Sequence, residues 1–208
     1  MKLLALETST QVCAAAVLEN EQLLADYRTN LKNVHAVMIF RQIDCLLCDV
    51  GLSAGNLAGI AVSIGPGSFT GLRIGLSAAK GLAFGRRLPL VGVPSLQSLI
   101  ADIAVESGRF VVVRRSRADE YYAAVYERRD RQEAMTQDVR LVSRHSLLEC
   151  LPAPCFLAGD VDEFIGRTPT GCTVLAKELT LPCAYRVGRL GLQMMRNRQF
   201  IDLDHSEP

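Results

Sequence analysis

Apolar and polar positions alternate in a way that divides the first half of the chain into short elements. Apolar segments bounded by polar or turn-forming residues predict strands, and apolar residues three or four positions apart predict helices. Three strands in a meander, followed by helix and strand in alternation, are typical of a mixed sheet with helices on its faces. The predicted elements are strands at 2–8, 12–19 and 22–28, a helix at about 34–50, a strand at 59–64, a helix at about 70–86, a strand at 88–93 and a helix at about 96–106.

The second half has shorter strands, separated by charged turns. We place the boundary between two lobes at Ser107–Gly108, which gives an N-terminal lobe at 1–107 and a C-terminal lobe at 108–208. The class is therefore α/β, with mixed sheets flanked by helices. The elements predicted for the second lobe are strands at about 110–114, 121–127, 138–142 and 155–158, a short helix near 144–150, a weak helix–strand pair to about 175, and a closing helix at about 181–198.

The helix at 34–50 is apolar around most of its circumference, with Gln42 and Asp44 as nearly its whole polar face. A surface helix normally carries a full polar face opposite the core, so this one is either enclosed within the fold or docked against another chain. One stripe is expected to face the core: Ala36, Ile39, Phe40, Ile43, Leu46, Leu47 and Val50. The second stripe consists of Val34, Val37, Met38, Arg41, Cys45 and Cys48.

The segment SIGPGSFTGLR, residues 63–73, joins a strand to a helix and has the composition of a phosphate loop. A P-loop needs Lys after its last glycine, but Leu72 follows Gly71, and Thr70 stands where a dinucleotide fingerprint needs its third glycine. A tight turn that lets the helix lie close to the sheet is the favoured interpretation, with Ser68 or Thr70 as the helix cap. Phosphate binding through Gly65, Gly67 and Ser68 stays the weaker alternative.

The first strand ends in Glu7, followed by Thr8, Ser9 and Thr10. A carboxylate beside hydroxyl groups at a strand end can position a metal-bound phosphate, which makes Glu7 a weak cofactor candidate. A polar hairpin turn would use the same residue types, so this segment alone favours neither interpretation.

Catalytic and metal-binding patterns are weak throughout. Cys45 and Cys48 are neighbours on one predicted helix, and a zinc site would need two more ligands nearby. His35, His145 and His205 are scattered, and no nucleophile–base spacing can be identified. The sequence therefore predicts no catalytic residue and no metal site.

Charge and hydropathy limit the remaining classes of protein. Lys and Arg total 23 and Asp and Glu 22, so the net charge of +1 gives no reason to expect autonomous nucleic-acid binding. We expect the two arginine clusters to be solvated charges at turns and strand ends: Arg114, Arg115 and Arg117, then Arg128, Arg129 and Arg131. The sequence contains no apolar run of membrane-spanning length and no signal-peptide core, so a cytoplasmic protein is expected. The seven cysteines are expected to be buried thiols.

Three segments resemble a known family. LLALETST, GPGSFTGLRIGLSAAKGLA and VGVPSLQSL, in this order, are similar to the bacterial TsaB (YeaZ) family over about the first 105 residues. Glu7 stands where that family usually has Asp, and the second lobe matches less closely, with RSRADEYY at 115–122. The resemblance implies the two-lobed fold of actin, Hsp70 and sugar kinases, called the ASKHA fold.

The resemblance also implies a function. It implies a non-catalytic partner of a TsaD-like subunit in the complex that adds threonylcarbamoyl to adenosine beside the tRNA anticodon, joined by a TsaE-like ATPase. The chain would bind no cofactor by itself, ATP would enter with the assembled complex, tRNA would be bound only through the complex, and the chain alone would form a homodimer. The alternative is a stand-alone ASKHA-type ATPase or phosphotransferase that uses Glu7 and the glycine segment. The residues expected at the partner interface are Val34, His35, Val37, Met38, Arg41, Cys45, Leu72, Gly75, Ala78 and Ala79.

Overall fold

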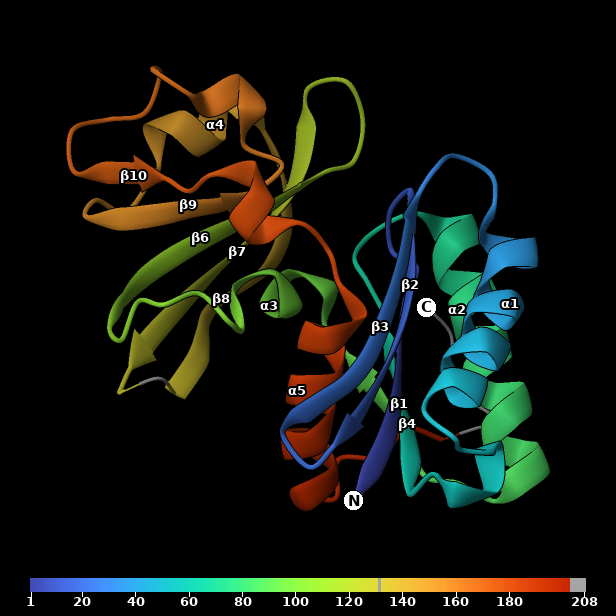
Figure 1. The fold of residues 1–208 in the computed structure, drawn as a ribbon. Coiled ribbons are helices and arrows are strands. Elements are labelled where there is room, and N and C mark those ends of the chain that lie inside the picture. Colours follow the sequence, from blue (N-terminus) through green and yellow to red (C-terminus); the bar gives the residue numbers. More distant parts are fainter. Residues whose placement is uncertain (131, 203–208) are drawn as a thin grey trace. The chain divides into compact units, whose positions relative to one another are not determined.

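The computed structural model describes residues 1–130 and 132–202, which form two structural units (Figure 1). Unit 1 consists of Met1–Ser98 together with the chain from Pro182 onward, and unit 2 is the continuous segment Leu99–Leu181. No helix in the described part of the chain is both long and apolar enough to span a bilayer.

Unit 1 is built on a five-stranded sheet in the order β3-β2-β1-β4-β5. The first three strands form an antiparallel meander, and β4 and β5 continue it in parallel, which confirms the expected mixed sheet. The strands are β1 (Lys2–Glu7), β2 (Val12–Glu19), β3 (Gln22–Asn30), β4 (Gly59–Ser63) and β5 (Leu90–Val93).

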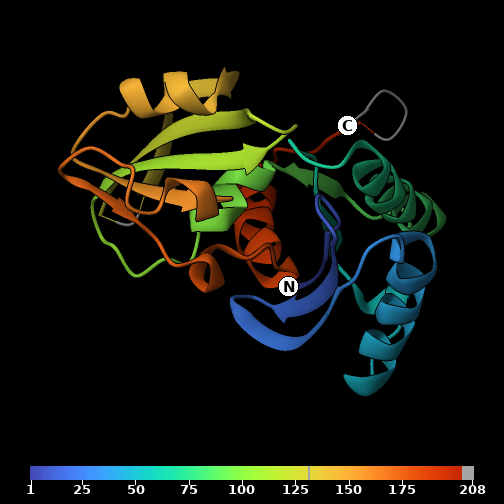
Figure 2. The same ribbon diagram turned by 90° about the horizontal axis from the view of Figure 1, so that it is seen from above.

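Three longer helices cover the sheet of unit 1. Helices α1 (His35–Asp49) and α2 (Phe69–Arg86) lie on one face, where Leu4 and Leu6 of β1 join Ile39 of α1 in a buried apolar cluster. Helix α5 (Ala184–Arg196) lies on the opposite face of the sheet, as Figures 1 and 2 show. A short 3₁₀ turn (Ala54–Asn56) precedes β4, and the short helix α3 (Ser95–Ile100) follows β5.

The place of α5 corrects the expected domain division, because this closing helix belongs to unit 1. Small residues allow it to lie directly on the sheet: a Cβ on Gly188 would come within 2.4 Å of Leu18 Cδ1, and one on Gly191 within 2.4 Å of Ala61 Cβ. The apolar face of α5 is therefore matched to strands that precede it by more than a hundred residues.

The boundary near the middle of the chain also differs from the expected one. The division falls between Ser98 and Leu99, within α3, and the helix predicted at 96–106 ends at Ile100. The reason is the side chain of Arg128, which donates hydrogen bonds to the carbonyl oxygens of Ile100, Ile103 and Val105. These carbonyls are used by unit 2 instead of by further helical turns.

Unit 2 has its own five-stranded sheet, in the order β10-β9-β6-β7-β8. Its core contains Tyr121 and Phe164, whose rings meet edge to face at 5.1 Å between centroids. The short strand β10 lies at one edge of the sheet and the long strand β8 at the other. The elements are β6 (Gly108–Arg115), β7 (Glu120–Arg129), β8 (Gln132–Ser143), α4 (Arg144–Glu149), β9 (Cys155–Gly159), β10 (Cys172–Val174) and 3₁₀ turns at Asp162–Phe164 and Lys177–Thr180.

Candidate interaction site

The glycine segment between β4 and α2 packs against the turn that joins β1 to β2. A Cβ on Gly67 would lie 2.3 Å from Ser9 O, one on Gly71 2.2 Å from Thr8 O, and one on Gly75 2.1 Å from Thr8 Oγ1. No real Cβ atom approaches other atoms so closely, so each position requires glycine. The backbone amide of Ser68 also donates to Ser9 O at 2.7 Å. This geometry supports the packing interpretation of the segment.

Polar groups of the same segment are bonded within unit 1. Ser68 caps α2, as expected for one of the two candidate caps, because its Oγ accepts from the amide of Gly71 at 3.2 Å. Gly65, at φ +104°, donates from its amide to Ser95 Oγ at 3.0 Å, and its carbonyl accepts from the amide of Ser95 at 2.8 Å. Ser63 and Ser95 share a further hydrogen bond of 2.6 Å. The segment is thus fastened to the start of α3.

Glu7 is completely buried at the end of β1. Its Oε1 accepts from the amide of Ser9 at 2.6 Å, whereas its Oε2, Thr8 Oγ1 and Ser9 Oγ have no hydrogen-bond partner among the described residues. The start of α5 is nearby, since the pKa of the Cys183 thiol is raised chiefly by burial, with a smaller contribution from the Glu7 carboxylate. These three oxygens retain capacity to bind a water molecule or a cation.

Within the described residues, no group of three or more His, Cys, Asp and Glu side chains is placed to hold a metal ion. The expectation of buried thiols is wrong for Cys45, Cys48 and Cys150, which are exposed. His145 lies 3.2 Å from Glu149 on the surface of α4. His205 lies outside the described residues.

Two polar side chains of α1 point toward the sheet. The opposite face of the helix therefore points outward. His35 Nε2 lies 3.2 Å from Val12 O, and Gln42 Nε2 donates to Cys13 O at 3.1 Å and to Thr29 Oγ1 at 2.9 Å. Because β2 and β3 satisfy these groups, burying them carries no unpaired-group penalty.

The predicted core stripe of α1 is therefore only partly right. Ile39, Ile43, Leu46 and Leu47 are buried as expected, but Ala36 and Phe40 are exposed, and Gln42, assigned to the polar face, is buried. The helix is rotated so that its His35–Gln42 side faces the sheet. Its outward face carries apolar side chains instead, including Val37 at 74% exposure.

Helix α2 continues this apolar exposure. Phe69 and Phe84 are exposed at 60% and 80%, and the Arg73 guanidinium lies 3.9 Å above the Phe69 ring. Between α1 and α2 lies a hollow of about 480 Å³, with Phe40 and Ala36 on its α1 side. We call this region the α1–α2 surface and define it by Ala36, Val37, Phe40, Phe69, Thr70, Arg73, Ile74, Ser77, Ala78 and Phe84.

The residues expected at a partner interface are divided between this face and the core. On the outward side, Val37, Arg41 and Cys45 are exposed and Val34 and Met38 are half-buried. Ala78 lines the hollow but is itself buried, at 2% exposure. Four others are buried in unit 1 and cannot contact a partner there: His35, Leu72, Gly75 and Ala79. For Gly75 the reason is that the small-residue side of α2 faces the β1–β2 turn, and for His35 it is the contact of its ring with Val12 O.

Sequence reasoning missed Phe69, Arg73 and Phe84. A signal for them was present: a helix that turns its small residues inward must carry its large apolar ones on the other side. Phe69, Arg73 and Ser77 are spaced four residues apart and so share one face of α2.

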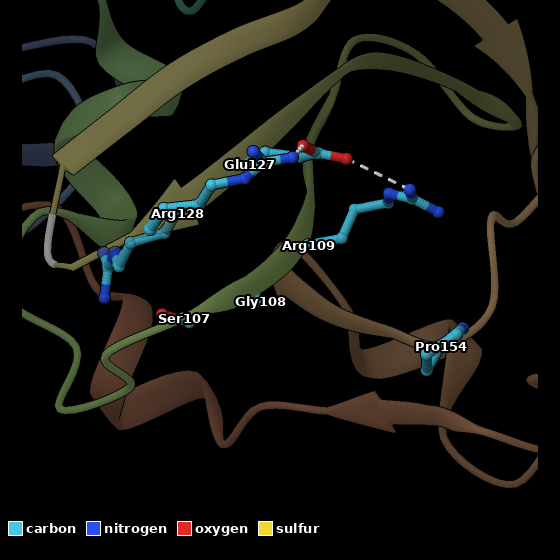
Figure 3. Close-up of a pocket in the computed structure, with 7 residues that line it drawn as sticks. Ser107, Gly108, Arg109, Glu127, Arg128 and Pro154 are labelled. Atoms are coloured by element: carbon cyan, nitrogen blue, oxygen red, sulfur yellow. Dashed lines mark hydrogen bonds and ion pairs between the residues drawn. The ribbon is translucent and has the colours of Figure 1, made fainter.

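A second hollow, of about 330 Å³, lies in unit 2 and is lined by arginines (Figure 3). Glu127 joins two of them, with Oε1 at 3.1 Å from Arg109 Nη2 and Oε2 at 3.2 Å from Arg129 Nη2. The hydrogen bond from Arg109 is the main reason that the pKa of Glu127 is lowered. Arg109 also donates to the carbonyl of Pro152 at 3.2 Å. The lining thus has three arginines and one carboxylate, and Arg128 finds its ion-pair partner, Glu133, outside the lining.

The expectation that both arginine clusters are solvated is wrong for Arg128 and Arg114. Arg128 is buried between three carbonyl oxygens, the Glu133 carboxylate and the Phe110 ring, 4.6 Å from its centroid. Arg114 is buried 3.7 Å from Asp160.

The other members of these clusters are nearer the surface. Arg115 Nη1 pairs with Glu163 at 2.9 Å, and Arg117 and Arg129 are highly exposed. Arg131 lies outside the described residues.

Comparison with known proteins identifies the family. The sequence profile described as TsaD, tRNA N6-adenosine threonylcarbamoyltransferase, matches residues 22–154. The chain is 34% identical over 127 residues to tRNA threonylcarbamoyladenosine biosynthesis protein TsaB of Bacillus subtilis, covering 61% of this chain and 56% of the relative. It is 26% identical to the protein of the same name in Escherichia coli, covering 100% of this chain and 93% of the relative.

A solved structure agrees over the whole chain. YeaZ from Pseudomonas aeruginosa superposes with a TM-score of 0.85 at 26% identity, covering 100% of this chain and 98% of that one. The expected ASKHA fold class is confirmed. The chain therefore belongs to the TsaB (YeaZ) family, with a TsaD-type sequence over residues 22–154.

Proposed function

We propose that this chain is a non-catalytic partner subunit of the complex that makes threonylcarbamoyladenosine in tRNA. Its TsaB relatives are named as tRNA threonylcarbamoyladenosine biosynthesis proteins, and the TsaD profile is described as the transferase. The observation that carries the proposal is the α1–α2 surface, where apolar side chains face outward beside a hollow of about 480 Å³. Apolar side chains exposed around a hollow in this way are typical of a site of protein association.

A TsaD-like subunit is the partner that we assign to this surface. The chain itself has a TsaD-type sequence, so a TsaD-like partner would present helices equivalent to α1 and α2. Two copies of one fold can pair through the same elements about a twofold axis. The same reasoning gives a homodimer when the chain is alone, which the TsaD-like partner would displace.

Two positions on α2 suit close approach of another helix. Added Cβ atoms at Gly81 and Gly85 would have no neighbour within 4 Å, so the backbone there is open. Glycine in a helix interior costs about 1 kcal/mol relative to alanine, and no contact with the described residues compensates for it here. A partner that buries the nearby apolar side chains would stabilise the complex by about 25 cal/mol per Å² of apolar area buried.

The alternative, a stand-alone ATPase or phosphotransferase, is less well supported. The β1–β2 turn occupies the space beside Gly67 and Gly71, so these residues do not form an open phosphate-binding loop. Glu7 is fully buried. Within the proposal the chain alone binds no cofactor, a TsaE-like ATPase joins the assembled complex with ATP, and tRNA is bound only through that complex.

Light scattering coupled to size-exclusion chromatography tests the pairing, with the chain alone and with the TsaD-like protein of the same organism. We expect a dimer that exchanges into a one-to-one heterodimer. Val37→Asp should weaken both assemblies by at least about tenfold, since a desolvated unpaired charge costs several kcal/mol and 1.4 kcal/mol is tenfold. Ile165→Asp is the matched control, because Ile165 is an exposed apolar residue of unit 2 that the α1–α2 surface does not include.

Two results would overturn the proposal. One is a Val37→Asp protein that melts like the wild type and pairs as tightly. The other is nucleotide hydrolysis by the isolated chain that is lost in Glu7→Gln, which would favour the alternative.

A further inference from the structure

Two cysteine side chains of unit 2 lie in direct contact across neighbouring strands. In the parallel pair β9–β10, Cys155 is opposite Cys172, and their Sγ atoms are 3.3 Å apart. Both are free thiols: Cys155 is buried and Cys172 is half-buried. Both pack on the same apolar cluster of unit 2, so their side chains leave the same face of the sheet.

The backbone geometry suits a covalent link between them. Neighbouring strands lie about 4.8 Å apart, within the range of about 4.4–6.8 Å between Cα atoms that a disulfide needs. The ladder begins at this pair, with the Cys155 amide donating to Gly171 O at 3.3 Å and the Leu175 amide to Leu157 O at 2.8 Å. The Sγ atoms are 3.3 Å apart, and a disulfide requires about 2.05 Å, so the contact must shorten by little more than 1 Å.

We propose that Cys155 and Cys172 are an oxidation site, forming an intramolecular disulfide when the protein meets a peroxide. The half-buried Cys172 thiolate attacks the O–O bond of hydrogen peroxide, giving a sulfenic acid and hydroxide. The sulfur of Cys155 then displaces the hydroxyl group, forming the S–S bond and releasing water. In sum, two thiols and one peroxide give one disulfide and two waters, and a dithiol reductant reverses the change.

The roles of the two residues follow from their surroundings. Cys172 is the accessible sulfur, whereas Cys155 is enclosed with its S–H directed at Cys172. Burial is the main reason that the pKa of Cys155 is raised to about 12, so it is a poor first nucleophile toward an oxidant in solution. It is already in contact with Cys172 and so can resolve the oxidised form.

Oxidation would fix an edge of the sheet. Strand β10 is three residues long and hydrogen-bonds only to β9 in the sheet order of unit 2. The new bond would close the segment between the two cysteines into a covalent loop and hold this edge in place.

Peptide mapping of the full chain after peroxide treatment tests the proposal. Trypsin gives one peptide with both Cys150 and Cys155 (residues 145–167) and another with Cys172 (residues 168–177). The Cys150→Ser variant removes the ambiguity. We expect the two peptides to be linked in wild type and Cys150→Ser, and separate in Cys172→Ser. In the Cys150→Ser protein, oxidation should also raise the melting temperature, and a dithiol should restore the original value.

The proposal fails if Cys155 and Cys172 both remain open to alkylation after Cys45 and Cys48, the exposed thiols of α1, have been oxidised. It also fails if Cys172 is linked to Cys150 in the wild type and to nothing in Cys150→Ser.

Discussion

Gly75 of α2 lies so close to Thr8 that a Cβ on Gly75 would come within 2.1 Å of Thr8 Oγ1. This contact fixes how near α2 lies to the end of β1. A segment that resembles a phosphate loop is thus explained by packing against the residues that follow the first strand.

Substitution of Gly75 by Ala should destabilise unit 1 by about 1–3 kcal/mol, the usual cost of forcing a methyl group into a filled site. Gly81→Ala on the exposed side of the same helix should instead leave the monomer equally stable or more stable by up to about 1 kcal/mol, because only helix propensity changes before a partner is bound. Urea unfolding of both variants measures the difference. Equal effects would show that the inward face of α2 is not tightly packed.

Replacement of Arg128 by Leu should cost about 3–5 kcal/mol, because it removes the ion pair that Arg128 makes with the buried Glu133 carboxylate. Three carbonyl oxygens would lose their donor as well. Arg129→Leu, at an exposed neighbouring position, should change the free energy of unfolding by no more than about 0.5 kcal/mol. Similar losses in the two variants would contradict the structural role of Arg128.

Removal of the Ser95 hydroxyl should loosen the joint between β4 and α3. Ser95→Ala leaves the Gly65 amide and the Ser63 hydroxyl without this partner, at a cost of about 1–3 kcal/mol for buried groups. Ser77→Ala on the exposed side of α2 is the control. Hydrogen exchange at the Gly65 amide should rise in the first variant alone, and unchanged protection there would count against the role of Ser95.

The loss of folding stability at acid pH should depend on Tyr121. Its hydroxyl donates to Glu163 Oε2 at 2.9 Å, and this bond is the main reason that the pKa of Glu163 is lowered in the fold. A lowered folded-state pKa gives stability that is present above the unfolded value of about 4.3 and is lost as pH falls through the folded value. Tyr121→Phe should therefore be less stable than the wild type near neutrality.

This difference between Tyr121→Phe and the wild type should narrow as pH falls from about 4.3 through the lowered folded-state pKa of Glu163, because the carboxyl group is then protonated in both the folded and the unfolded state. Unfolding midpoints of both proteins, measured at a series of acidic pH values, show how the difference in stability depends on pH. A constant difference at every pH would mean that Tyr121 acts only through packing.

The elements of unit 1 could be predicted from the sequence because their patterns are strong. Strands of continuous small apolar residues and a glycine-rich joint leave few alternatives, and α1, α2 and β4 begin and end within about a residue of expectation. The family resemblance rests on these same segments.

The rotation of α1 could not be predicted. An apolar stripe normally identifies the core face, but His35 and Gln42 find hydrogen-bond partners on β2 and β3, so the buried face includes polar residues. That information lies in residues distant along the chain. Phe40 was therefore expected in the core and is exposed.

The division into units had a different cause. A seam at Ser107–Gly108 follows the local change in composition, whereas the real division depends on where Arg128 and α5 make their contacts. Arg128 and α5 each contact residues more than twenty positions away in the sequence, which a local pattern cannot reveal.

The return of α5 to the first sheet has a consequence for synthesis. Unit 1 is interrupted, since Ala5 and Leu18 meet Gly188 of a helix that is translated after all of unit 2. On the ribosome, one face of the β1–β2 hairpin must stay uncovered while the whole of Leu99–Leu181 emerges. Unit 2, which is continuous in sequence, can fold first. The sheet of unit 1 is completed only when α5 has been synthesised, because contacts between distant parts of a chain form late.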